Sequence, residues 1–189
     1  MAKSTSYRCG VEDFYVSYIT VGTGGALTYA TPAVLGGTAT VKVAYESGEN
    51  KIYESNLMIR NKRKVTGASV TYESRSVPLA DQAKVISGQE NSTDGEYEEG
   101  PDDIAPPVAV GWATPMTDGK FLCTWMYYAT ASRGDENYET AEDQENTPVD
   151  TYNFACIPAP DTGKLRRRKL CADATEKAAF FASVRKSDT

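Results

Sequence analysis

The sequence contains no histidine among its 189 residues. Without an imidazole the chain has no Ser-His or Cys-His nucleophile, no histidine metal ligand and no ordinary proton carrier near neutral pH. Carboxylate, lysine and tyrosine chemistry remain. The absence argues against most hydrolases and metalloenzymes, and we predict no catalytic residue, no cofactor and no metal site.

Cysteine is scarce and apolar runs are short. Cys9, Cys123, Cys156 and Cys171 show no C-x-x-C spacing, so we predict small core residues rather than a disulfide or zinc set. The first residues lack the apolar core of a signal peptide, and no run approaches the roughly 20 apolar residues of a membrane helix. These absences predict a protein that is made in a cytosol and does not engage a membrane.

Positive charge is in deficit, with 20 basic against 26 acidic side chains and a net charge of −6. This balance argues against a nucleic-acid-binding surface, because neutralising phosphates needs a basic face. Tyrosine is abundant, at 12 residues against 5 phenylalanines, which suits half-buried strands and interfaces. The length fits a single domain spanning residues 1–189.

Runs of β-branched and aromatic residues bounded by Gly, Pro and Asp predict a mainly β fold of the α+β class. We expect strands at Glu12–Ile19, Thr38–Glu46, Thr66–Arg75, Val108–Trp112, Phe121–Ala129, Tyr152–Ile157 and in the basic run ending at Cys171. Pro78 and Gly88 bracket one predicted helix, and a capping box at Asp173 begins a second, over about 174–186, that docks on its own domain. The pattern predicts seven or eight strands in a β-sandwich or partly closed barrel, with one flanking helix and a short C-terminal helix.

Three segments interrupt the strand pattern. Between Ser47 and Lys64 the alternation stops and a basic cluster appears, which predicts a long loop over residues 47–64. Residues 89–103 and 133–150 carry runs of Asp and Glu with almost no basic residue. Such runs predict solvated acidic loops.

The predicted strand Phe121–Ala129 is apolar on both faces. If Cys123 and Trp125 fill the core, the opposite face needs a second cover, which is either the helix or an adjacent subunit. We therefore predict inter-subunit contacts at Leu122, Met126 and Tyr128.

Three segments carry a resemblance to a known family: "SVPLADQAKVISG", "APPVAVGWATPMTDGKFLCTWMYYATAS" and "TPVDTYNFACIPAPDTGKLRRRKLCAD". In these the chain resembles the major tail proteins of long-tailed bacteriophages of Gram-positive bacteria, the short tail tube subunits. The resemblance runs from about Val11 to Asp173. It departs at Tyr53–Lys64, where relatives tend to be acidic and this chain is basic.

The resemblance implies a structural virion protein of the viral tail, assembled in the bacterial host cytoplasm. Subunits would form hexameric rings that stack into a tube for genome ejection, with double-stranded DNA only passing through the lumen. A tape measure protein and a tail terminator are the other implied partners. On this reading the polar residues that line the lumen are Thr40, Lys42, Glu46, Ser69, Thr71 and Glu73. The loop to the next ring would use Glu49, Lys51, Tyr53, Leu57, Ile59, Arg60, Lys62 and Arg63.

Other classes remain open at this stage. The inner tube of a contractile tail or injection system has the same fold, and the sequence does not show whether a sheath surrounds the tube. A carbohydrate-binding β-sandwich would also be acidic and rich in aromatics, although it would normally carry a leader. A carboxylate glycosidase needs two carboxyls at a fixed separation across a cleft, whereas the acids here concentrate in loops.

Overall fold

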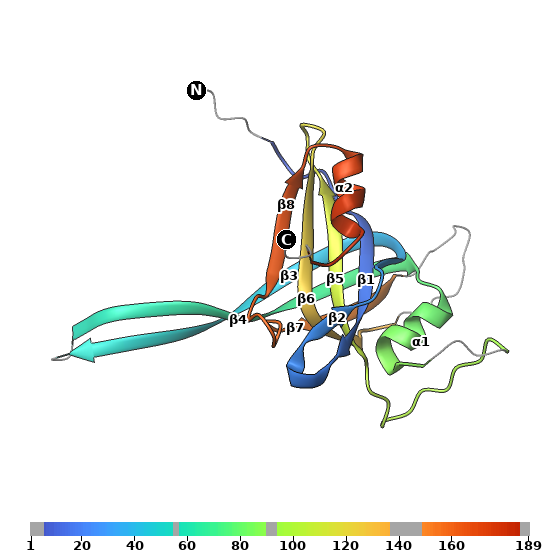
Figure 1. Ribbon diagram of the computed structural model, residues 1–189, viewed down its shortest axis with the longest axis horizontal. Coiled ribbons are helices and arrows are strands. Elements are labelled where there is room, and N and C mark those ends of the chain that lie inside the picture. The colour runs from blue at the N-terminus through green and yellow to red at the C-terminus, as the bar shows by residue number, and fades with distance from the viewer. Residues whose placement is uncertain (1–5, 55–56, 90–93, 137–148, 186–189) are drawn as a thin grey trace, which may run out of the picture.

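The computed structural model describes residues 6–54, 57–89, 94–136 and 149–185, and over these ranges the protein is mainly β. Eight strands and two α-helices are seen in this part of the chain (Figure 1). The strands are β1 (Glu12–Val21), β2 (Leu27–Tyr29), β3 (Ala33–Glu54), β4 (Leu57–Ser76), β5 (Pro107–Pro115), β6 (Phe121–Arg133), β7 (Asp150–Cys156) and β8 (Arg166–Cys171). The helices are α1 (Leu79–Ser87) and α2 (Ala174–Phe181). The predicted content of strands and helices is confirmed.

Six strands form a closed circuit of antiparallel pairs. The order β1-β3-β4-β7-β6-β5 returns to its start because β5 also pairs with β1. β2 adds to the end of β1, and β8 pairs with the first half of β6. The last residues of β6, by contrast, pair with β7, so β6 links the two halves of the sheet.

The inner face of the circuit encloses the larger of two cores. Predicted inward residues of β4, Ala68, Val70 and Tyr72, are buried there. The ring of Phe14 stacks on that of Tyr72 with centroids 4.1 Å apart. Val85 of α1 completes the same cluster, so this helix packs against the interior of the circuit, as its apolar spacing predicts.

A second core lies outside the circuit, beneath α2. Phe180 and Phe181 pack there on Trp125, whose indole Nε1 donates a hydrogen bond to the carbonyl of Phe180 at 3.3 Å. Asp173 caps the helix by accepting from the backbone N of Glu176 at 2.8 Å. The predicted capping box and self-docking are confirmed, although the helix ends at Phe181 rather than near residue 186.

The segment predicted as a long loop, residues 47–64, is instead the outer part of a β-hairpin. β3 and β4 stay paired from Gly37↔Ser76 to Glu54↔Leu57, and the turn at residues 55–56 lies outside the described residues. In Figure 1 the hairpin extends to the left, well beyond the body of the domain. The prediction failed because both faces of the outer hairpin are exposed along residues 47–49 and 61–66, so no apolar alternation marks it.

The two acidic segments connect elements of the body. Residues 94–103 form bends and turns without a strand or helix, and most of 133–150 lies outside the described residues. No helix in the described part of the chain is long and apolar enough to cross a lipid bilayer.

Candidate functional site

One outer face of the sheet carries polar side chains, and neither helix of the described residues covers it, unlike the face under α2. The register pairs Thr40 with Glu73 and Lys42 with Thr71, and it places Ser69 opposite Ala44. Side chains of paired residues point to the same side of a sheet. The structure therefore brings together the six predicted lumen residues, which are Thr40, Lys42, Glu46, Ser69, Thr71 and Glu73.

The polar face continues onto β7 and β6. Thr151 pairs with Glu73 and Asn153 with Thr71 on β7, and Ser132 of β6 pairs with Asn153. The Thr71 hydroxyl lies 3.1 Å from the amide oxygen of Asn153. We call this surface, on β3, β4, β7 and the end of β6, the polar sheet face.

The charge of the polar sheet face is largely balanced. Lys42 Nζ lies 2.7 Å from a carboxylate oxygen of Glu73. Hydrogen bonds from Lys42 and then Thr40 lower the pKa of Glu73 below its ordinary value. Glu46 is exposed and has no ion-pair partner among the described residues. Of the predicted lumen residues, Glu46 therefore supplies the uncompensated negative charge.

The outer hairpin has its own charge pattern. Glu49 pairs with Lys51 at 3.2 Å and with Arg63 at 3.9 Å, and it accepts a hydrogen bond from Asn61. Lys62 and Lys64 are exposed. The predicted inter-ring side chains of Tyr53, Leu57, Ile59 and Arg60 lie outside the set of described side chains.

The predicted inter-subunit patch on β6 needs correction. Met126 is 0% exposed and belongs to the larger core, so it is covered within the chain. Tyr128 is half-buried against the second core. Leu122 alone lies at an opening, where it lines a cavity. The period-two pattern could not assign these faces, because both faces of β6 are covered.

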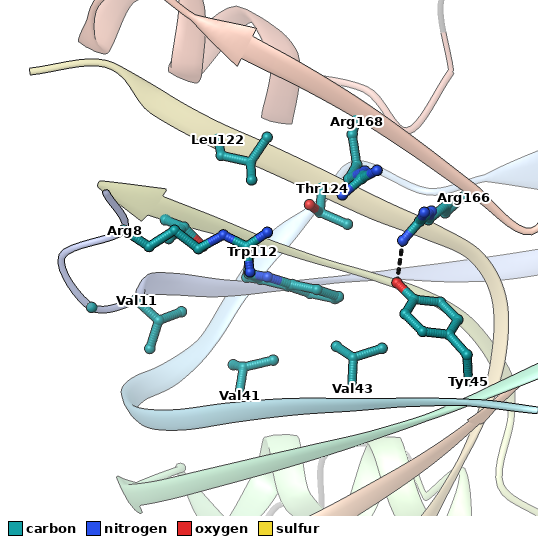
Figure 2. Close-up of a pocket in the computed structure, with 12 residues that line it drawn as sticks. Arg8, Val11, Val41, Val43, Tyr45, Trp112, Leu122, Thr124, Arg166 and Arg168 are labelled. Carbon is teal, nitrogen blue, oxygen red and sulfur yellow. Dashed lines mark hydrogen bonds between the residues drawn. The ribbon is translucent and has the colours of Figure 1, made fainter. Parts of the chain in front are cut away.

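That cavity, of about 330 Å³, is a feature that the sequence did not reveal. Figure 2 shows Arg8 reaching over Trp112, Arg166 turned to the hydroxyl of Tyr45 and Arg168 beside Thr124, with Val41 on the opposite wall. The remaining lining residues are Gly10, Val11, Val43, Tyr45, Thr114, Leu122 and Thr124. Arginine recognises carboxylates and phosphates through paired N–H donors, so the cavity is suited to an anionic ligand with an apolar part.

The cysteine and carboxylate side chains of the described residues do not indicate a metal site or a reactive thiol. Within the described ranges no three Cys, Asp or Glu side chains are grouped as a metal site requires. Burial raises the pKa of the Cys156 thiol to about 12, which disfavours the reactive thiolate. No known protein family and no curated protein sequence matches this chain.

Proposed function

We propose that this protein is a self-assembling tube subunit, the major tail protein of a long-tailed bacteriophage, whose hexameric rings stack into the conduit for the genome. The observation that carries the proposal is the polar sheet face: four strands with apolar side chains toward the core on one side and polar, hydroxyl-rich side chains on the other. The resemblance of three segments to tail tube subunits supports the same assignment, and a β-sandwich or partly closed barrel is the fold expected for it.

The free edges of the sheet support ring formation. In the described residues β3 pairs with β1 only over Ala33–Gly36, so one of its edges is open from Gly37 onward. At the other side of the four strands, Ala131–Arg133 of β6 extend beyond β5. Unpaired edges bind other strands, and a contact between different edges is heterologous, so a repeated rotation closes a ring.

The lumen assignment follows from the chemistry of the polar sheet face. Short hydroxyl and amide side chains offer DNA no strong anchor, and the Lys42–Glu73 pair cancels its own charge. Glu46 repeated around a ring would repel phosphates. Smooth passage of DNA needs this combination of weak contacts and mild repulsion.

The outer hairpin is suited to joining successive rings. It extends beyond the body of the domain (Figure 1), and in the described residues its two strands pair only with each other beyond Glu46 and Gly67. Its basic residues Lys62, Arg63 and Lys64 call for an acidic partner surface, and contacts of this kind weaken as salt increases.

Self-assembly is the direct test. Purified protein would be followed by mass photometry and negative-stain electron microscopy as its concentration rises. We expect hexameric rings and hollow tubes. A chain that stays monomeric at high concentration would contradict the proposal, and binding of the monomer to glycans would favour a carbohydrate-binding module. A sheath around tubes in native particles would indicate the contractile class.

The lumen assignment has a separate test. Replacing both Glu46 and Glu73 by Lys should leave tubes intact but slow DNA ejection, because the new cations attract phosphates. Added salt should relieve the defect. The matched control, Asp94→Lys with Glu96→Lys, makes the same change in net charge at two exposed residues outside the polar sheet face. Ejection as fast as in wild-type particles would place the polar sheet face elsewhere than in the lumen.

A further inference from the structure

The arginine-lined cavity has a defined origin in the sequence of β8, Arg-Arg-Arg-Lys-Leu-Cys. Successive side chains of a strand point to opposite sides. Arg167 lies over the ring of Phe180 at 4.7 Å, and Lys169 pairs with Glu176 at 3.3 Å. The side chains of these two residues therefore point toward α2. Arg166 and Arg168 therefore point the other way, into the cavity.

Arg8 reaches the same cavity from the N-terminal segment, which a backbone bridge to Met116 holds in place. Arg166 donates a hydrogen bond to the hydroxyl of Tyr45 and lies over its ring at 4.8 Å. Among the described residues no carboxylate lies within ion-pair distance of Arg8, Arg166 or Arg168. Three cations thus border one cavity without an anion, although the protein as a whole is acidic.

The cavity also has an apolar part. Val41, Val43 and Trp112 form its wall together with Leu122. Leu170, the residue after Lys169, is 51% exposed and pairs with Leu122 across the strands. A complementary ligand therefore presents carboxylates next to an aliphatic group.

The chain itself contains such a segment. Residues 94–103 hold six carboxylates and no basic side chain. Asp102 and Asp103 immediately precede Ile104, whose side chain is 83% exposed. An aliphatic side chain with so large an exposed fraction is suited to contact with a partner.

The segment cannot fill the cavity of its own chain. In Figure 1 the segment lies at the lower right, below α1, whereas β8, which supplies Arg166 and Arg168 to the cavity, lies on the left of the body. The outer hairpin leaves the molecule on that same left side. The acidic segment and β8 thus lie on opposite sides of the body, as a head-to-tail contact between two copies requires.

We propose that the cavity between β3, β5, β6 and β8 binds the acidic segment Glu98–Ile104 of a second copy, with Asp102 and Asp103 on the arginines and Ile104 on the apolar wall. This contact rests on the proposed self-assembly and gives it a specific joint. The cavity is a half-site that only a neighbouring copy completes. Because the joint is heterologous, each copy uses its cavity and its acidic segment toward different neighbours.

A peptide tests the contact without requiring assembly. A fluorescently labelled peptide of residues 94–106 is titrated into the full-length protein under conditions that keep it monomeric. We expect saturable binding that weakens at least about tenfold in Arg166→Glu/Arg168→Glu, as for close charge pairs at interfaces. Lys164→Glu, at an exposed residue that does not line the cavity, should bind like wild type. Peptides with Asp102→Asn/Asp103→Asn or with Ile104→Ser should bind more weakly.

Equal binding of a scrambled acidic peptide, or unchanged binding by the arginine variant, would overturn the proposal. Binding of inorganic phosphate in place of the peptide would identify a small-anion site and overturn it as well.

A charge swap tests the contact in the assembly. Arg166→Glu/Arg168→Glu and Asp102→Arg/Asp103→Arg should each raise the concentration needed for oligomers at least about tenfold. The two combined in one chain should restore assembly to near the wild-type level, with circular dichroism confirming that every variant is folded. A combined chain that assembles no better than either parent refutes the joint. If the wild-type protein forms no oligomer, the tube proposal fails. The peptide titration then still tests whether the cavity binds the acidic segment.

Discussion

Shortening the outer hairpin should abolish tube formation without unfolding the subunit. Replacing residues 50–62 by Asn-Gly leaves the pair Glu49↔Arg63 closed by a two-residue type I′ turn, which suits the twist of a hairpin. The shortened chain keeps every strand pair of the body. It loses only the outer part of the hairpin, for which we propose contact with a neighbouring ring.

The expected cost in stability is small. The flanking residues 47–49 and 61–66 are exposed, and in the described residues β3 and β4 pair only with each other beyond Glu46 and Gly67. Changes at exposed sites are usually within about 0.5 kcal/mol, and an isolated two-stranded ribbon is marginally stable at best. We therefore expect the free energy of unfolding to change by less than about 1 kcal/mol, a shift in Tm of roughly 2–4 °C at this size.

The assay combines thermal unfolding by circular dichroism with negative-stain microscopy. We expect a native-like melt and single rings in place of tubes. A second variant, Lys62→Ser/Arg63→Ser/Lys64→Ser, keeps the length of the hairpin and removes its basic cluster. It therefore distinguishes the effect of the hairpin's length from the effect of its charge. Long tubes from the shortened protein would refute the role in ring stacking, and a protein that no longer melts cooperatively would show that the hairpin stabilises the subunit.

Three further outcomes test the packing. A Cβ at Gly111 would lie 2.6 Å from an indole ring, so Gly111→Ala should lower the free energy of unfolding by about 1–3 kcal/mol in chemical denaturation, whereas Gly100→Ala meets nothing within 4 Å and should not. A thiol reagent should modify one cysteine, the exposed Cys9, in the native protein and all four only after unfolding; rapid native modification of a second thiol would contradict the burial. Hydrogen bonding to Arg185 lowers the pKa of Asp161 below its ordinary 3.8. The stability that this pair contributes is therefore present above pH 3.8 and is lost as the pH falls through the lowered pKa. Limited proteolysis should release the C-terminal segment faster at that low pH, and Asp161→Asn should remove this pH dependence.

The sequence predicts the body of the fold because its strands have one face on the core. Ala68, Val70 and Tyr72 alternate with polar residues and are buried as expected. Met126 defeats this reasoning, because Trp125 beside it is also buried, on the other side of β6. Where both faces are covered, period two carries no information about direction.

The arginine-lined cavity could not be predicted from the sequence, for a different reason. Arg8 and Arg168 are far apart in the sequence and meet only because β6 pairs with β8 while the N-terminal segment bridges Met116. No local pattern encodes that meeting. The signal that could have found it is the alternation in β8: a strand of four consecutive basic residues beside one helix must turn half of them away from it.

The unequal lengths of the two free sheet edges indicate which surfaces must contribute contacts between copies. The open edge of β3 begins at Gly37, whereas β6 extends beyond β5 only over Ala131–Arg133. Edge pairing between two copies is therefore limited to a few hydrogen bonds, each with a net contribution of about 0.5–1.5 kcal/mol. That is too little to overcome the cost of association, at least about 4 kcal/mol, by a useful margin. A ring built on the polar sheet face consequently needs contacts elsewhere. The arginine-lined cavity is our candidate for these contacts, whereas the outer hairpin would join one ring to the next.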